Sequence, residues 1–245
     1  MKNIIVGIGL LFTSCFANAA LVTYHDYTLD DETNIVTGGG LEWLQWDVTV
    51  GMTINEALAD IADGIINGIT YGSGWQLATN VQMASLFNTF VLGATVPWDE
   101  SETTGQQAKN YDGPTVENTG TDAELQMVAL FGSTDPDNVD TRGSDDPVDF
   151  TGALFGNDMN GDGLYNSAIV MDDFAVKYAG NFHGFNYLTS DAYSADYRRS
   201  ASGASAIGVA FVRTPQASTD VAEPGAITLM AIGLFGLAIR RKYTV

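Results

Sequence analysis

The chain has 245 residues and a formal net charge of −20 at pH 7, with 30 acidic residues against 10 lysines and arginines. Such an acidic surface repels nucleic acids and anionic lipids and attracts divalent cations or polycations, so nucleic-acid binding is excluded as a class of function. Many secreted proteins are acidic for solubility alone, and this interpretation stays open beside a cation-binding one.

The first 19 residues have the organisation of a secretory signal peptide. Lys2 gives a positive start, residues 4–12 form an apolar core, and Ala17-Asn18-Ala19 is a small-x-small cleavage site before Ala20. We therefore expect signal peptidase to cut between Ala19 and Ala20; an N-terminal strand or anchor is the alternative. Cys15 is the only cysteine and lies in the segment removed, so the mature chain is expected to lack disulfides and thiolate sites.

The region after this cleavage site predicts three strands, because β-branched and aromatic residues alternate with polar ones between turn-forming residues. The expected strands are residues 21–27, 35–37 and 41–46, with a polar turn at 30–34. In the third strand, alternation puts Leu41 and Trp43 on one face and Leu44 and Trp46 on the other. A strand that is apolar on both faces is expected at the centre of a sheet.

Three capping boxes, each with threonine followed three residues later by glutamate or glutamine, predict three helices. The boxes are Thr53 to Glu56, Thr79 to Gln82 and Thr121 to Glu124. Apolar residues at helical spacing then predict the buried faces, and Gly132 is expected to end the third helix. The expected faces are Leu58, Ile61 and Ile65; Met83, Leu86, Phe87, Phe90 and Val91; and Leu125, Val128 and Ala129.

The second half of the chain is predicted to be mostly β, between two polar segments, 93–120 and 132–147, that we interpret as long surface loops. Short strands are expected at residues 150–155, 164–170, 174–178, 185–188, 192–197 and 206–212. The predicted class is α+β: one exported domain, 20–213, of mixed, mainly antiparallel short strands with two or three helices. A tether, 214–220, and a C-terminal hydrophobic helix are expected to follow.

One loop has the spacing of a calcium site. Side-chain oxygens of Asp158, Asn160 and Asp162 occupy positions 1, 3 and 5, the carbonyl of Leu164 position 7 and Asn166 position 9. Gly163 takes the sixth position, where the loop must turn. A bidentate glutamate is missing, because Ile169 stands where it would close a complete site. Calcium is thus one interpretation, and an Asn/Gly/Asp-rich turn between two strands is the other.

Residue patterns for catalysis are sparse. His25 and His183 are the only histidines and lack the spacing of a zinc motif, so an ordinary structural role is expected for each. A carboxylate pair of the glycosidase type stays open, because sequence alone does not locate such a pair among so many acids. Several aromatic residues are candidates for stacking on sugars, although such residues more often belong to a core. They are Trp98, Tyr111, Tyr165, Phe182, Phe185 and Tyr187.

The C-terminal end has three parts in a fixed order. Ala222-Glu223-Pro224 is followed by residues 226–239, which carry no charge, and then by Arg240-Arg241-Lys242. A helix over 226–239 would reach about 20 Å, short of the roughly 30 Å hydrocarbon layer, and the cations mark its cytoplasmic end. An ordinary membrane anchor and a buried helix are the alternatives.

This order resembles the PEP-CTERM sorting signal, with alanine in place of the first proline of the box. The resemblance covers residues 221–242 and implies recognition by an exosortase at Glu223, Pro224 and Gly225, with Arg240, Arg241 and Lys242 as the terminal cluster. It further implies a transient stay in the inner membrane through segment 226–239. Delivery to the cell surface or extracellular matrix of a Gram-negative cell would follow.

Three further pieces resemble a module of exported PEP-CTERM proteins and, more distantly, C-type-lectin-like domains. They are residues 40–44 (Gly-Leu-Glu-Trp-Leu), 74–79 (Gly-Trp-Gln-Leu-Ala-Thr) and 209–213 (Val-Ala-Phe-Val-Arg). Gln76 and Ala78 depart from the arginine and proline of the lectin-like pattern. The favoured hypothesis is a non-enzymatic surface or matrix protein that binds calcium or exopolysaccharide. A secreted carbohydrate-active enzyme and a C-terminally anchored periplasmic protein are the alternatives.

Overall fold

The computed structural model describes residues 22–92, 97–99, 106–113, 123–135, 150–156, 158, 161–171, 182–197 and 206–216. By its internal contacts the chain divides into two units, Met1–Thr214 and Pro215–Val245. The described helices and strands all lie in the first unit, and their mixture of short strands with three α-helices is α+β, as the sequence predicts.

The first sheet has six strands, in the order β1-β2-β3-β4-β13-β7, and every neighbouring pair in it is antiparallel. Its strands are β1 (Val22–Tyr24), β2 (Tyr27–Asp30), β3 (Ile35–Gly38), β4 (Leu41–Leu44), β7 (Gln76–Leu77) and β13 (Phe211–Arg213). The prediction of one strand over 21–27 was wrong: His25 has φ +54°, so the chain turns there and Tyr24 pairs with Tyr27 across a hairpin.

Strand β4 is central, as predicted, because it lies between β3 and β13. The expected facing of Trp46 was wrong. The strand ends at Leu44, and residues Trp46–Thr49 form a 3₁₀ helix, η1. Leaving the strand frees Trp46 from the two-residue alternation, so it packs in the same core cluster as Trp43, and both rings contact Phe131.

The second sheet has five strands, in the order β12-β9-β10-β11-β8, and only the β12–β9 pair is parallel. Its strands are β8 (Gln106–Gly113), β9 (Phe150–Phe155), β10 (Leu164–Met171), β11 (Phe182–Ser194) and β12 (Gly208–Val209). The strands predicted at 150–155 and 164–170 are confirmed, and the one at 174–178 lies outside the described residues.

Three predictions for this sheet were wrong. Segments 185–188 and 192–197 belong largely to the single strand β11, in which a register shift opposite Tyr165 and Ser167 absorbs the polar residues between them. Segment 206–212 divides at Ala210 into β12 and β13, which belong to different sheets. Residues 106–113, expected in a loop, form the edge strand β8, because backbone pairing with β11 does not require apolar alternation.

The three helices are α1 (Ile54–Ala62), α2 (Asn80–Phe90) and α3 (Ala123–Phe131). Both side-chain-to-backbone bonds of the capping box are present at Thr53 and again at Thr79, as predicted. Thr121 lies outside the described residues, and Gly132 ends α3 with φ +81° and an amide bonded to the Val128 carbonyl.

The predicted apolar faces are confirmed in part. Met83, Leu86, Phe87 and Phe90 are buried, but Val91 is 67% exposed because it takes the left-handed position that caps α2. In α1 the buried face is Ile54, Ala57 and Ile61. Ile65 lies beyond the helix in the hairpin formed by β5 (Ile65–Ile66) and β6 (Ile69–Thr70).

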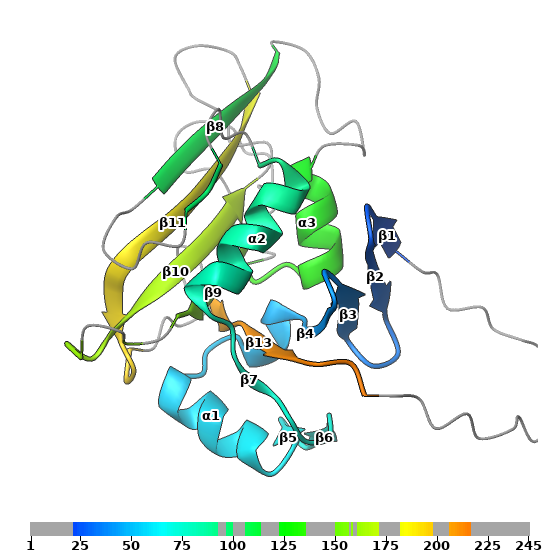
Figure 1. Ribbon diagram of the computed structural model, residues 1–245, viewed down its shortest axis with the longest axis vertical. Coiled ribbons are helices and arrows are strands. Elements are labelled where there is room, and N and C mark those ends of the chain that lie inside the picture. Colours follow the sequence, from blue (N-terminus) through cyan, green and yellow to red (C-terminus); the bar gives the residue numbers. More distant parts are fainter. Residues whose placement is uncertain are drawn as a thin grey trace, which may run out of the picture. The chain divides into compact units, whose positions relative to one another are not determined.

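Two core clusters fill the described part of the first unit. The first contains residues of α2 and α3 together with Trp43 and Trp46; the second contains residues of α1 together with Leu44, Trp75 and Phe150. Adjacent residues of one strand contribute to different clusters, as Trp43 and Leu44 do in β4. Figure 1 shows α2 and α3 side by side and α1 close to the β5–β6 hairpin.

Candidate functional site

The residues predicted for sorting and cleavage lie outside the described part of the chain. They are Ala19, Ala20, Glu223, Pro224, Gly225, Arg240, Arg241 and Lys242. No helix in the described part of the chain is both long and apolar enough to cross a membrane. Segment 226–239 lies outside that part. These features of the sequence stay predictions.

The predicted calcium loop leads into β10, and two of its acids are hydrogen bonded to the backbone. Oδ2 of Asp158 accepts from the amide of Gly163 at 2.9 Å, and Oδ1 of Asp162 accepts from the amide of Leu164 at 2.8 Å. The second oxygen of Asp158 is shielded from solvent and accepts no hydrogen bond from the described residues. Each carboxylate therefore shapes the turn with one oxygen.

The two asparagines among the predicted ligands are separate cases. Asn160 lies outside the described residues. Asn166 is buried, and its side-chain amide donates to Oδ1 of Asn80 at 3.1 Å, so it joins β10 to the start of α2. Within the described ranges, no three histidine, cysteine, aspartate or glutamate side chains group together in a way that would hold a metal ion.

The candidate residues for catalysis or sugar stacking are dispersed. His25 lies in the β1–β2 turn against the ring of Tyr24, and His183 lies in β11, in a part whose side chains are not described. Trp98 is 4% exposed and therefore offers no open ring face. Tyr165 and Tyr187 are half-buried beside the second core cluster, and the side chains of Tyr111, Phe182 and Phe185 are not described.

A hollow of about 450 Å³ lies beside the outer face of α2, lined by Val81, Ala84, Ser85, Asn88, Thr89 and Trp98. The Asn88 side chain clamps the backbone of Trp98: it donates to the Trp98 carbonyl at 3.0 Å and accepts from the Trp98 amide at 2.7 Å. The small side chains of the lining leave the space open, and the two hydrogen bonds of Asn88 join α2 to the segment of Trp98.

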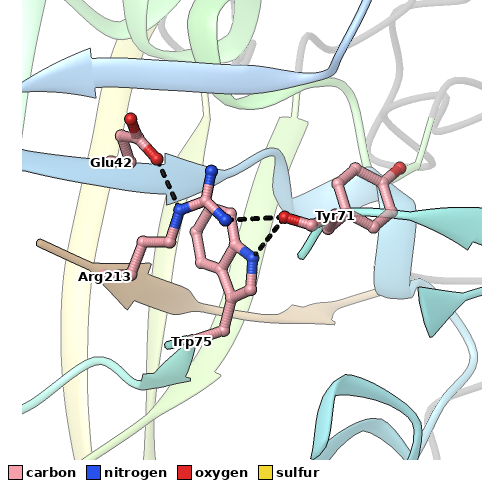
Figure 2. A network of polar contacts seen from close by, with 4 residues as sticks. All are labelled: Glu42, Tyr71, Trp75 and Arg213. Atoms are coloured by element: carbon pink, nitrogen blue, oxygen red, sulfur yellow. Dashed lines mark hydrogen bonds and ion pairs between the residues drawn. The ribbon is translucent and has the colours of Figure 1, made fainter. Parts of the chain in front are cut away.

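A group of polar contacts joins the sequence pieces 40–44, 74–79 and 209–213. They contribute the strands β4, β7 and β13, and β13 lies between the other two. Arg213, the last residue of β13, is directly opposite Glu42 of β4, and its Nε donates to Oε2 of Glu42 at 2.5 Å. The guanidinium carbon lies 4.3 Å from the centre of the Trp75 ring (Figure 2).

The carbonyl of Tyr71 completes this arrangement by accepting two hydrogen bonds. Nη1 of Arg213 donates to it at 2.6 Å, and Nε1 of Trp75 donates to it at 3.1 Å, as Figure 2 shows. We call Glu42, Tyr71, Trp75 and Arg213 the Arg213 clasp. Arg213 is only 9% exposed, so its charge is balanced by a carboxylate, a carbonyl and an aromatic face rather than by water.

The sequence did not reveal the clasp, although a signal for it was present. Glu42 and Arg213 are single charged residues in otherwise apolar strands, a pattern that suggests a buried ion pair. Their pairing needs the contact between β4 and β13, which are separated by most of the chain. The clasp is suited to a structural role, because the guanidinium of Arg213, the carboxylate of Glu42 and the carbonyl of Tyr71 bind one another.

Comparisons with models of known families, with curated proteins and with solved structures found no match to this chain.

Proposed function

We propose that this protein is an exported, non-enzymatic surface or matrix protein, processed by signal peptidase at Ala19-Ala20 and by an exosortase at Glu223-Pro224. The observation that carries the proposal is the order of features at the C-terminal end: an acidic and proline-containing box, an uncharged segment and a cluster of three cations. Segment 226–239 holds the chain transiently in the inner membrane, and the cut passes the domain outward.

The position of the box relative to the last strand supports this proposal. Strand β13 ends at Arg213, whereas the box begins at Ala222, so a cut there would leave every described strand and helix in one piece. A removable signal needs this separation, because a cut inside a central strand would break the sheet.

The exported domain, in this proposal, acts by binding calcium or polysaccharide. One oxygen of Asp158 is shielded from solvent and has no hydrogen-bond partner among the described residues, which favours a cation or a water at that loop. The lectin-like resemblance of the sequence pieces that form β4, β7 and β13 suggests a glycan.

The test is cell fractionation of the full chain in a Gram-negative host that has an exosortase. Variants Pro224→Ala and a deletion of residues 240–242 should accumulate in the inner membrane, while the unchanged chain reaches the surface fraction. Pro215→Ala is the matched control, because it changes a proline outside the box, and it should be delivered normally. Normal delivery of the Pro224→Ala and deletion variants would refute the sorting role.

A further inference from the structure

Strand β13 of the first sheet is held by few backbone contacts. In β13, residues Val212 and Arg213 pair with β4, and residues Phe211 and Val212 pair with β7. An antiparallel ladder of this length is weak by itself, and a strand next to a chain end frays first. Phe211 and Val212 are buried in the two core clusters, so the part of β13 that needs a further contact is its end at Arg213.

The Arg213 clasp supplies that fixation at the residue where fraying would begin. Arg213 is the final residue of β13, and its guanidinium contacts β4 through Glu42 and the segment before β7 through Tyr71 and Trp75. Only six lysines and arginines lie between residues 20 and 220, against 29 acids, and this one is buried. Removing one partner of a buried ion pair is strongly destabilising, because the other charge stays buried without compensation.

We propose that the Arg213 clasp is the C-terminal stop of the folded domain: it halts unravelling and trimming that begin in the tail before they reach β13. The inference builds on the proposed function, in which the tail is cut and a new C-terminus is exposed outside the cell. The described contacts of the clasp all join residues from Glu42 to Arg213, so removal of the tail after Arg213 leaves these contacts intact.

The test is digestion of the full chain in mild detergent with a carboxypeptidase, followed by intact-mass measurement over time. The expected product of the unchanged chain keeps Arg213 as its resistant boundary. In Arg213→Met, trimming should continue into β13. Arg213→Lys should give an intermediate result, because lysine keeps the charge but not the planar group that contacts Glu42, Tyr71 and Trp75 together.

A second pair of variants separates the clasp from a general effect of charge. Glu42→Gln removes the anion of the clasp, and Glu32→Gln makes the same chemical change at an exposed turn between β2 and β3. Only Glu42→Gln should move the trimming boundary. Because digestion is done on purified full chain, its result does not depend on whether an exosortase cuts the protein in the cell.

Hydrogen exchange distinguishes local release from general unfolding. In Arg213→Met, protection of the β13 amides should fall about a hundredfold, while the amides of β10 keep theirs. Equal boundaries in wild type, Arg213→Met and Glu42→Gln would overturn the proposal. So would loss of protection that extends equally through β10 in Arg213→Lys and Glu42→Gln, because the clasp would then be one more part of the global core.

Discussion

The side-chain amide of Asn166 in β10 donates to Oδ1 of Asn80, the first residue of α2, inside the protein. Both residues are buried, so removing either side chain leaves a polar partner without this bond and away from water. We expect Asn166→Ala to lower the free energy of unfolding by about 1–3 kcal/mol. Urea denaturation measures the effect.

Asn55→Ala is the matched control for this pair. Asn55 also donates through its side-chain amide, to Oδ1 of Asp196 at 2.6 Å, but this bond is exposed. Water can replace an exposed partner, so the control should cost less than the buried substitution. Equal losses of unfolding free energy in the two variants would show that burial does not determine how much the Asn80–Asn166 hydrogen bond contributes to stability.

Calcium binding is tested by calorimetric titration of the full chain in mild detergent. If the loop binds calcium, saturable heat should appear at an affinity of the order of 10⁻⁴–10⁻³ M, typical of extracellular modules. The double variant Asp158→Ala, Asp162→Ala should lose this heat. Asp31→Ala, Asp63→Ala removes two exposed acids elsewhere and should keep it. Absence of heat in all three proteins would reduce the loop to a turn.

Tyr27 makes stability depend on alkaline pH. Burial, with a smaller contribution from the charge of Asp26, raises its pKa from 10.0 to about 12, and a hydrogen bond with Thr89 opposes the shift. The folded state therefore favours the neutral phenol. Its contribution is complete below pH 10 and is lost as pH rises from 10 toward about 12, up to roughly 3 kcal/mol in total.

The variant Tyr27→Phe isolates this contribution, because phenylalanine fills the same space without an ionisable group. Urea midpoints of the two proteins should converge or cross as pH rises through this window. Tyr27→Phe should be somewhat less stable at neutral pH, where the hydrogen bond with Thr89 is lost. Parallel curves across the window would contradict a raised pKa at Tyr27.

Gly208 in β12 is a point of close approach between backbones. A Cβ at this position would collide with the carbonyl of Trp46 in η1, which is main chain and has no rotamer to change. We expect Gly208→Ala to lower the free energy of unfolding by about 1–3 kcal/mol or more. Gly161→Ala is the comparison for strain without collision, since Gly161 has φ +76° and a Cβ there would meet no described atom within 4 Å. A smaller loss at 208 than at 161 would exclude steric contact as the cause.

Sequence reasoning succeeded where the determining interactions are local. The capping boxes at Thr53 and Thr79 involve residues three positions apart, and both helices begin where these boxes predict. Strand β9 is also predicted within its observed bounds, because its apolar run is flanked by polar segments. The class of the fold follows from such local signals.

Long-range contacts explain most of what was missed. Segment 206–212 divides between two sheets because β12 pairs with β9 and β13 pairs with β4 and β7, and no local pattern contains these pairings. The clasp needs Arg213 opposite Glu42. For Asn166 a signal did exist: in a strand beginning at Leu164, alternation puts it on the same face as Ala168 and Val170, which are buried in the core.

The measurement that tests the central claim most directly is intact mass spectrometry of the protein recovered from the surface of an exosortase-bearing cell. The account predicts a chain that begins at Ala20 and ends at the cut near Glu223-Pro224, without segment 226–239. A surface-delivered protein that still carries its C-terminal Val245 would contradict processing at this signal.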